Sequence, residues 1–228
     1  MKKNNLDIAK NNVSSKGQIK AYDLVRTINN NGKLSVLFVG NSITRHAPAK
    51  DIDWLGDWGM AASSEETDYV HLVVKGLEKK YGKVNFCTAC CADWEREYYN
   101  DEKIETYNKA RDFNADVIVI RLGENVYKPI ADDKDEKPLY PKLNNFIKYF
   151  NKSGKAKIII TGLFWQFEII ENILEKIALD NGYIFVRLND ISLKNENKAI
   201  GQFKHEGVCL HPNDSGMNFI ANRILEKI

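Results

Sequence analysis

Short apolar runs rich in β-branched residues alternate along this chain with longer segments whose apolar residues fall on one helical face. The runs occupy residues 34–39, 83–88, 116–122, 157–161 and 183–188. The longer segments occupy residues 68–81, 139–151, 167–180 and 215–228. Strands that alternate with helices are typical of βα units, which place their strands in a parallel sheet. Because the five runs are short, mainly apolar and rich in β-branched residues, the pattern predicts an α/β fold with a five-stranded parallel sheet covered by helices on both faces.

The two ends of this pattern indicate one domain with a short polar extension. Four apolar residues ahead of the first run recur at helical spacing, which predicts a leading helix. They are Ile19, Tyr22, Val25 and Ile28. Residues 1–16 are mostly polar and are expected to form an N-terminal extension, which leaves residues 17–228 as a single domain. The charged, proline-containing stretch at 128–138 is interpreted as an exposed loop of that domain.

Composition excludes several classes of protein. Hydrophobic residues make up 43% and charged residues 28% of the 228 residues, as in ordinary globular proteins. The formal net charge is only +2, and acidic and basic residues are interspersed, so no nucleic-acid partner is expected. The apolar runs are far shorter than the roughly 20 residues that cross a bilayer, so no membrane span is expected. The first residues lack the apolar core of a secretory signal, and the four cysteines are too few for a disulfide scaffold, which together favour a cytoplasmic location.

Three short motifs lie where a site would form in such a sheet. Gly40-Asn41-Ser42 directly follows the first predicted strand, Gly123-Glu124-Asn125 follows the third, and His211-Pro212-Asn213-Asp214 leads into the last predicted helix. In open parallel sheets, ligands bind beyond the carboxyl ends of the strands. Acyl transfer needs a hydroxyl nucleophile, an imidazole that carries its proton, and donors aimed at the developing oxyanion. Ser42, His211 and Asn125 could supply these functions, although each alone has an ordinary explanation as a turn or cap residue.

Together the motifs resemble those of the SGNH (GDSL-like) hydrolase family. The resemblance runs from residues 40–44 through residues 123–125 to residues 211–217, in the order found in the family, and so covers most of the chain. It implies a three-layer α/β/α sandwich of flavodoxin-like topology and serine-dependent hydrolysis of esters, without a metal or an organic cofactor. It also implies that Ser42 is the nucleophile and His211 the general base and acid. The Ser42 backbone N–H and the Asn125 side-chain amide would then form part of the oxyanion hole.

The chain departs from the family pattern around the nucleophile and in the second motif. The family usually has aspartate where Asn41 and Val126 stand, and neither change removes a reacting group. It normally supplies a glycine N–H after the second strand. Cys90 is the nearest match in this chain, and because a backbone donor does not require glycine, Cys90 is expected to complete the oxyanion hole.

The largest departure concerns the acid that orients the histidine. The family places aspartate three residues before the histidine, and this chain has Val208 there. Glu206 lies five residues before His211 and is one candidate for the missing acid. The alternative is a backbone carbonyl that holds the imidazole, which would leave a Ser–His dyad.

Aromatic and charged residues near the motifs suggest the substrate. Tryptophan faces suit sugar rings, although core packing is the more common role for any single tryptophan. The segment at 45–66 is long for a simple connection and is expected to wall one side of the site. The expected substrate-binding residues are Arg45, Asp57, Trp58, Trp94 and Trp165.

The sequence therefore predicts a serine esterase that removes a small acyl group, expected to be acetyl, from a carbohydrate or related small ester through an acyl-serine intermediate. One alternative is an acyltransferase, in which a sugar hydroxyl replaces water. Another is a glycan-binding domain that has lost catalysis, suggested by Val208 and the unusual second motif. A nucleotide or flavin binder is not favoured, because no glycine-rich phosphate loop follows the first predicted strand. The oligomeric state is left open.

Overall fold

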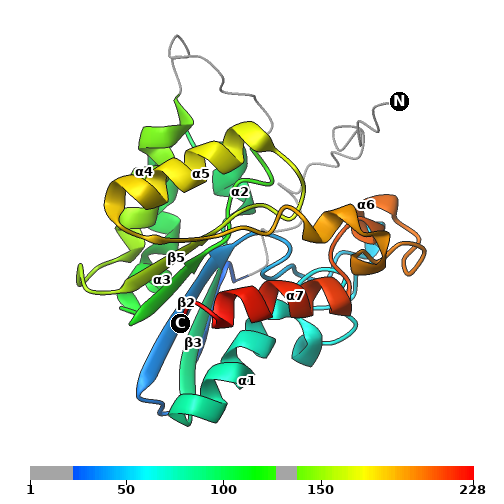
Figure 1. Cartoon of the computed structure of the whole chain (residues 1–228), viewed down its shortest axis with the longest axis horizontal. Coiled ribbons are helices and arrows are strands. Elements are labelled where there is room, and N and C mark those ends of the chain that lie inside the picture. The colour runs from blue at the N-terminus through cyan, green and yellow to red at the C-terminus, as the bar shows by residue number, and fades with distance from the viewer. Residues whose placement is uncertain (1–22, 127–137) are drawn as a thin grey trace.

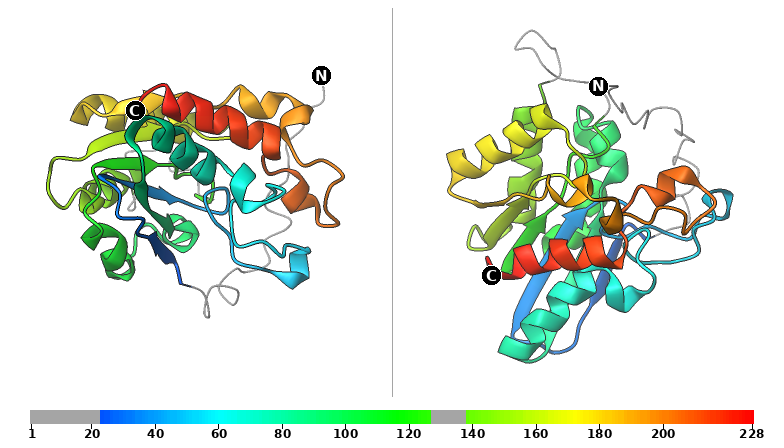
Figure 2. Two further views of the ribbon diagram at one scale, coloured as in Figure 1. Left: turned by 90° about the horizontal axis from the view of Figure 1, so that it is seen from below. Right: turned by 45° about the vertical axis from the view of Figure 1, so that its right-hand side comes forward.

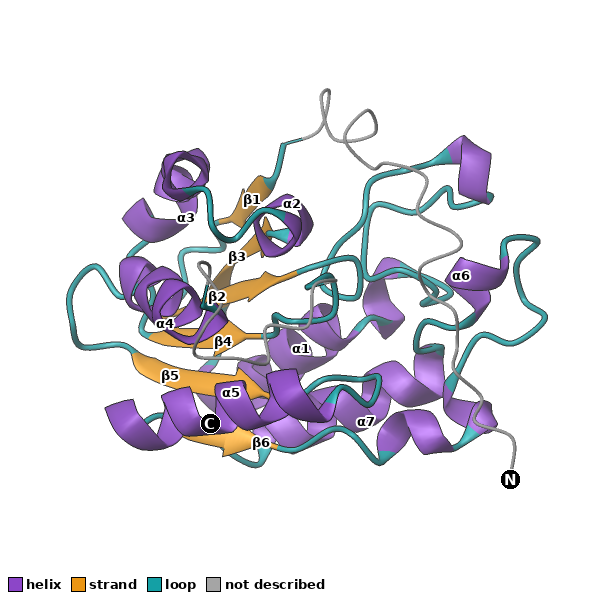
Figure 3. Cartoon of the chain, turned by 90° about the horizontal axis from the view of Figure 1, so that it is seen from above, coloured by secondary structure: helices purple, strands orange, loops and turns teal. Residues whose placement is uncertain are grey.

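Helices cover both faces of a six-stranded sheet in the computed structural model of this chain (Figure 1). The structure describes residues 23–126 and 138–228. The strands are β1 (Val25–Ile28), β2 (Leu34–Gly40), β3 (Val84–Cys90), β4 (Val117–Ile120), β5 (Lys157–Thr161) and β6 (Ile184–Val186). They lie in the order β1-β3-β2-β4-β5-β6, which Figure 3 shows along the edge of the sheet. Strands β2 to β6 are parallel, and β1 pairs with β3 in the antiparallel sense.

Two helical layers enclose this sheet. The helices are α1 (Tyr69–Tyr81), α2 (Ala92–Arg96), α3 (Asn108–Asp112), α4 (Leu139–Phe150), α5 (Glu168–Asn181), α6 (Glu206–Cys209) and α7 (Asp214–Leu225). Short 3-10 turns occupy Lys50–Ile52, Glu65–Thr67, Asp101–Tyr107, Ile191–Leu193 and Asn195–Asn197. Helices α1 and α7 lie side by side on one face (Figure 2), and α3, α4 and α5 cover the other.

The two cores explain why the strands carry apolar residues on both faces. In β2, Leu37 and Val39 pack beneath α3, α4 and α5, whereas Val36 and Phe38 pack against α1 and α7. Successive side chains of a strand point to opposite faces, so a sheet buried on both faces needs apolar residues at every position. The predicted three-layer α/β/α sandwich is confirmed, and each of the five predicted runs contains a parallel strand.

The predicted helix ahead of the first strand is wrong over its second half. Residues Val25–Ile28 form the extra strand β1, in register from Val25 opposite Ala89 to Ile28 opposite Phe86. The helical spacing of Val25 and Ile28 is outweighed because β1 satisfies the backbone hydrogen bonds along the free edge of β3. The remaining helical residues, the extension at 1–16 and nearly all of the loop at 128–138 lie outside the described residues.

A small apolar cluster joins two loop segments beyond the carboxyl ends of the strands. Trp54 and Met60, from the segment after β2, pack there with Ala199 and Val208, from the segment before α7. Figure 2 shows these two segments projecting together from the same end of the sheet. The cluster thus fixes the position of the segment that carries His211 relative to the turn that carries Ser42. Across residues 23–126 and 138–228, no helix has the length and apolar character needed to span a membrane.

Candidate active site

Ser42 lies in a tight turn at the carboxyl end of β2. The backbone N–H groups of Thr44 and Arg45 donate to the Asn41 carbonyl at 2.9 and 3.0 Å and close the turn. Position 40, just before the turn, has no room for a side chain, because a Cβ there would lie 1.9 Å from the Thr44 hydroxyl oxygen. The close approach of Thr44 therefore requires glycine immediately before the Asn41-Ser42 pair.

His211 reaches Ser42 from the far end of the chain. Its Nε2 lies 3.0 Å from the Ser42 Oγ, and its Nδ1 lies 2.7 Å from the Gly207 carbonyl oxygen. A carbonyl oxygen only accepts hydrogen bonds, so Nδ1 carries the hydrogen and Nε2 is left to accept the serine proton. This is the tautomer that a general base for Ser42 requires.

Burial determines the protonation state of this imidazole. It lowers the pKa of His211 to about 3, and the hydrogen bond to the Gly207 carbonyl opposes this effect only in part. The neighbouring His46, Arg121 and His205 lower it further. The imidazole is therefore neutral near pH 7 and able to accept a proton.

The expected role of Glu206 as the acid is wrong. Glu206 is the exposed first residue of α6, and the His211 Nδ1 is occupied by the carbonyl of the following residue, Gly207. Val208, at the family's aspartate position, is buried in the small apolar cluster that holds the two loops together. The short helix presents its backbone to the imidazole, so Ser42 and His211 form a dyad.

The expected role of Cys90 in the oxyanion hole is also wrong. Its backbone N–H donates to the Leu24 carbonyl at 2.9 Å, which extends the pairing between β1 and β3. The next amide, that of Cys91, donates to the Gly40 carbonyl at 2.6 Å. Burial raises the pKa of the Cys90 thiol to about 11, so this cysteine is an uncharged core residue. Strand pairing thus uses the amide that the family pattern suggested.

Asn125 lies in the turn that follows β4, at the same end of the sheet as Ser42. Its Nδ2 donates to Glu95 Oε2 at 2.6 Å, and its Oδ1 accepts from Arg96 at 3.4 Å. These contacts settle which end of the amide faces Glu95, because a carboxylate oxygen pairs with the nitrogen and a guanidinium with the oxygen. The side chain is half-buried.

A buried polar network lies directly behind the turn that carries Ser42. Asn41 Nδ2 donates to Glu124 at 2.8 Å and to Glu95 at 3.2 Å. Asn41 Oδ1 accepts from the Arg121 guanidinium at 3.2 Å, and Arg121 also pairs with Glu124. The network explains why asparagine stands where the family usually has aspartate. A carboxylate at position 41 would place a third negative charge against Glu95 and Glu124 and could donate to neither.

Comparisons with known proteins identify the fold that carries this site. No protein-family model matches the chain, and no curated protein matches its sequence. A protein assigned as a GDSL-like lipase from Parabacteroides merdae is similar in structure, with a TM-score of 0.58 and 18% identity over 86% of this chain and 95% of that chain. The lipase/acylhydrolase from Enterococcus faecalis has a TM-score of 0.55 and 14% identity over 86% and 95%. The chain has the SGNH (GDSL-like) hydrolase fold.

A family two carbohydrate esterase from Cellvibrio japonicus is also similar, with a TM-score of 0.55 and 11% identity. The likeness covers 86% of this chain and 60% of that one. In each of these comparisons the aligned part extends over most of the chain, so the SGNH hydrolase fold accounts for the sheet and both helical layers.

Trp94 belongs to the core of the SGNH hydrolase fold, and its expected contact with substrate is wrong. It is 1% exposed and stacks on Phe146 of α4, with ring centroids 3.8 Å apart and planes inclined by 8°. The sequence places Trp94 just after β3, but α2 turns its side chain beneath the helical layer. Its position in the chain could not distinguish these two directions.

Trp165 lies against the His211 imidazole. Its ring meets His211 edge-on at 5.1 Å between centroids, and its Nε1 donates to the Leu210 carbonyl at 3.2 Å. Trp58 lies in the loop after β2, and its Nε1 donates to the Ala62 carbonyl at 2.9 Å. Both indoles are partly exposed. Trp165 therefore holds the backbone that carries His211.

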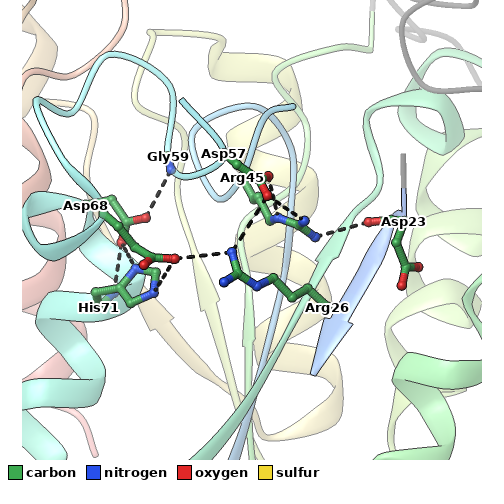
Figure 4. Close-up of polar contacts among 8 residues, drawn as sticks. Asp23, Arg26, Arg45, Asp57, Gly59, Asp68 and His71 are labelled. Carbon is green, nitrogen blue, oxygen red and sulfur yellow. Dashed lines mark hydrogen bonds and ion pairs between the residues drawn. The ribbon is translucent and has the colours of Figure 1, made fainter. Parts of the chain in front are cut away.

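The predicted substrate residues Arg45 and Asp57 bind each other. The Arg45 guanidinium is only 6% exposed and contacts the two Asp57 carboxylate oxygens at 3.0 and 3.2 Å (Figure 4). It also donates to the Asp23 carbonyl at 3.1 Å. This arginine fastens the loop after β2 to the residue that precedes β1. That Arg45 and Asp57 bind substrate stays a prediction.

Ion pairs of Arg26 with Asp57 and Glu65 connect this group of contacts to a histidine near the start of α1 (Figure 4). His71 Nδ1 lies 2.8 Å from Asp68, and its Nε2 lies 3.4 Å from Glu65. Burial disfavours the charged imidazole, but the two carboxylates outweigh this effect and raise the pKa of His71 above its ordinary value of 6.5. Protonated His71 therefore stabilises the folded state.

We expect a pH-dependent loss of stability in His71→Gln. The stabilisation by protonated His71 is complete below about pH 6.5, the unfolded value, and disappears as the pH rises through the higher folded pKa. The fall in melting temperature caused by the substitution should therefore be larger at pH 5.5 than at pH 9. Glu65→Gln removes one of the two carboxylates and should reduce the difference between the two pH values. Equal losses for His71→Gln at both pH values would contradict this assignment.

The functional residues that sequence reasoning missed belong to the buried network. Arg121 is a cation directly after four apolar residues, 117–120, and this position indicates a buried partner. Glu95 lies in a charged stretch after β3 and resembled an ordinary surface residue, yet its side chain is fully buried. Only the packing of α2 against the turn after β4 reveals its role.

Proposed function

We propose that this chain is a serine esterase in which Ser42 and His211 carry out the chemistry. One observation supports this proposal above all others: the 3.0 Å contact between Ser42 Oγ and His211 Nε2, with Nδ1 held by the Gly207 carbonyl. A nucleophile, a base and a group that orients the base are the components of serine-dependent acyl transfer. The likeness in fold to lipases, acylhydrolases and a carbohydrate esterase agrees with this chemistry.

The proposed reaction has two halves. In the first, Ser42 Oγ attacks the acyl carbonyl carbon while His211 Nε2 takes the hydroxyl proton. His211 then gives this proton to the leaving alcohol oxygen as the ester C–O bond breaks, which leaves the acyl group on Ser42. In the second half, His211 deprotonates a water molecule that attacks the acyl-serine, and the proton returns to Ser42 Oγ as the carboxylic acid leaves.

The oxyanion formed in each half needs hydrogen-bond donors. The Ser42 backbone N–H has no acceptor within residues 23–126 and 138–228, which agrees with its proposed use as one donor. The Asn125 side-chain amide is proposed as another, because Asn125 lies at the same end of the sheet as Ser42 and its nitrogen carries two N–H groups, of which the Glu95 contact uses one. Donors fixed before the reaction stabilise the developing charge without reorganisation, and each is typically worth about 100- to 1,000-fold in rate.

We propose a carbohydrate or related small ester, with acetyl as the acyl group, as the substrate. The partly exposed indoles of Trp58 and Trp165 support a sugar, since apolar faces of sugar rings pack on aromatic rings while their hydroxyls seek polar neighbours. The fold shared with a carbohydrate esterase agrees with this substrate class. We propose hydrolysis rather than acyl transfer to a sugar hydroxyl, because hydrolysis is the simpler reaction and needs only water as the second reactant.

The substrate proposal is tested with esters that differ in one part at a time. Nitrophenyl acetate, butyrate and octanoate vary the acyl chain, and acetylated glucose and xylose vary the alcohol. We expect kcat/KM to fall from acetate to octanoate and acetate to be released from the acetylated sugars. A preference for octanoate would overturn the acetyl assignment. Turnover of the aryl esters without release from any acetylated sugar would overturn the carbohydrate assignment.

A further inference from the structure

Glu95 is a fully buried carboxylate at which two turns of the site meet. Its Oε2 accepts from Asn125 Nδ2 at 2.6 Å. Its Oε1 accepts from Asn41 Nδ2 at 3.2 Å and from the Gly123 backbone N–H. Asn41 adjoins Ser42 in the turn after β2, while Gly123 and Asn125 belong to the turn after β4. One side chain from α2 thus connects both turns, and the steps proposed above give it no part.

We propose that Glu95 is a positioning residue that fixes the orientation of the Asn125 amide in the oxyanion hole. This inference rests on the proposed esterase function, in which Asn125 acts as a donor. Glu95 would not touch the substrate and would act through Asn125 alone.

The argument depends on how an amide is oriented. The oxygen and nitrogen of an asparagine amide have nearly the same shape, so packing alone does not decide between its two orientations. A carboxylate accepts hydrogen bonds, and Glu95 Oε2 therefore selects the nitrogen of Asn125. With one N–H of Asn125 bound to Glu95, the direction of its second N–H is also set. An amide turned by 180° would present an oxygen to the oxyanion and repel it.

The surroundings of Glu95 also link this role to pH. The charged and titratable groups around it are Glu124 and Arg121 from the end of β4, Cys90 and Cys91 from the end of β3, and Asp93 and Arg96 from α2. Burial first, and then the charge of Glu124, raise the pKa of Glu95 to about 7, although the bonds from Gly123, Asn125 and Asn41 oppose this. Both Glu95 oxygens face N–H donors, so a proton on Glu95 finds no acceptor among them and the neutral carboxyl holds these donors more weakly. His211, whose pKa is about 3, titrates well below this range.

The test compares Glu95→Gln with a matched substitution of another buried glutamate. The glutamine places an NH₂ group against at least one of the donors that the carboxylate accepts, while it keeps the size of the side chain. We expect kcat on nitrophenyl acetate at pH 8 to fall about 10- to 100-fold, within the effect of losing one oxyanion donor, with KM within about threefold. Glu171→Gln, on α5, changes a buried carboxylate outside the site and should leave kcat unchanged.

A double variant separates positioning from a general structural effect. In an Asn125→Ala background, Glu95→Gln should cause no further loss of kcat, because its only route to the reaction is gone. The same fold-loss in both backgrounds would overturn the proposal, as would a kcat of Glu95→Gln within threefold of the parent. Circular dichroism checks that each variant is folded at the assay temperature.

The parent chain supplies a measurement that needs no variant. Its kcat should fall below about pH 7 and level off at a rate about 10- to 100-fold lower, and the fall should be absent from folded Glu95→Gln. A parent kcat that is constant from pH 5.5 to 8.5 would overturn the proposal even if Glu95→Gln fails to fold. Failure of the proposed function is distinct, because in that case Ser42→Ala retains the parent's turnover whatever Glu95→Gln does.

Discussion

Replacement of Ser42 or His211 by alanine is expected to lower kcat/KM for nitrophenyl acetate by a factor of roughly 10³ to 10⁶. The two side chains form one acid–base unit through the 3.0 Å contact between Oγ and Nε2, so loss of either stops acyl transfer. For the same reason the double variant should be no slower than either single variant. The assay is the initial rate of nitrophenol release at pH 8.

Ser153→Ala provides the matched control for this experiment. Ser153 is exposed in the turn after α4, and its removal should leave the rate unchanged. If Ser42→Ala kept a tenth or more of the parent's rate while remaining folded, the hydroxyl would not be the nucleophile. If His211→Ala kept a tenth or more of the parent's rate while Ser42→Ala did not, the base would have to be another group.

Arg121→Met should cause the largest loss of stability among the substitutions considered. The guanidinium is fully buried, pairs with Glu124 and donates to Asn41 at 3.2 Å. Removal of the guanidinium leaves the buried carboxyl groups of Glu124 and Glu95 close together without a cation. Breaking a buried ion pair in this way costs about 3 to 5 kcal/mol of unfolding free energy. For a domain of this size this corresponds to a fall in melting temperature of roughly 6 to 20 °C.

Lys142→Met is the surface counterpart of this change. Lys142 pairs with Asp101 at 2.6 Å, but both side chains reach solvent. Solvent screening limits such a pair to about 1 kcal/mol or less. Thermal unfolding followed by circular dichroism compares the two variants. A melting temperature for Arg121→Met as high as that of Lys142→Met would show that the buried network contributes little to stability.

The strands of the sheet and the contact between Ser42 and His211 could be predicted from local sequence patterns. A strand buried on both faces is mainly apolar on both, so the runs at 34–39 and 116–122 could be recognised as strands without knowledge of their neighbours. Parallel strands end at a common edge, which is why motifs separated by 169 residues could be expected to meet. The contact between Ser42 and His211 is the consequence.

The features that could not be predicted depend on pairing and burial. Residues Val25–Ile28 form a strand only because the edge of β3 is open to them. Whether Glu206 or the Gly207 carbonyl faces His211 depends on the direction of one helical turn, which spacing does not encode. In the sequence Glu95 looks like an ordinary charged residue, and only the packing of α2 shows that its side chain is buried behind the turn that carries Ser42.

Reaction with a fluorophosphonate, followed by mass spectrometry of the digested chain, tests most directly whether Ser42 is an activated nucleophile. Such reagents form a stable phosphonyl ester only with a serine whose proton can be removed by a neighbouring base. The geometry of the dyad predicts one adduct, on the peptide that contains Ser42, and its absence from His211→Ala. An unmodified Ser42 peptide, or an adduct that forms equally in His211→Ala, would contradict a catalytic Ser42–His211 dyad.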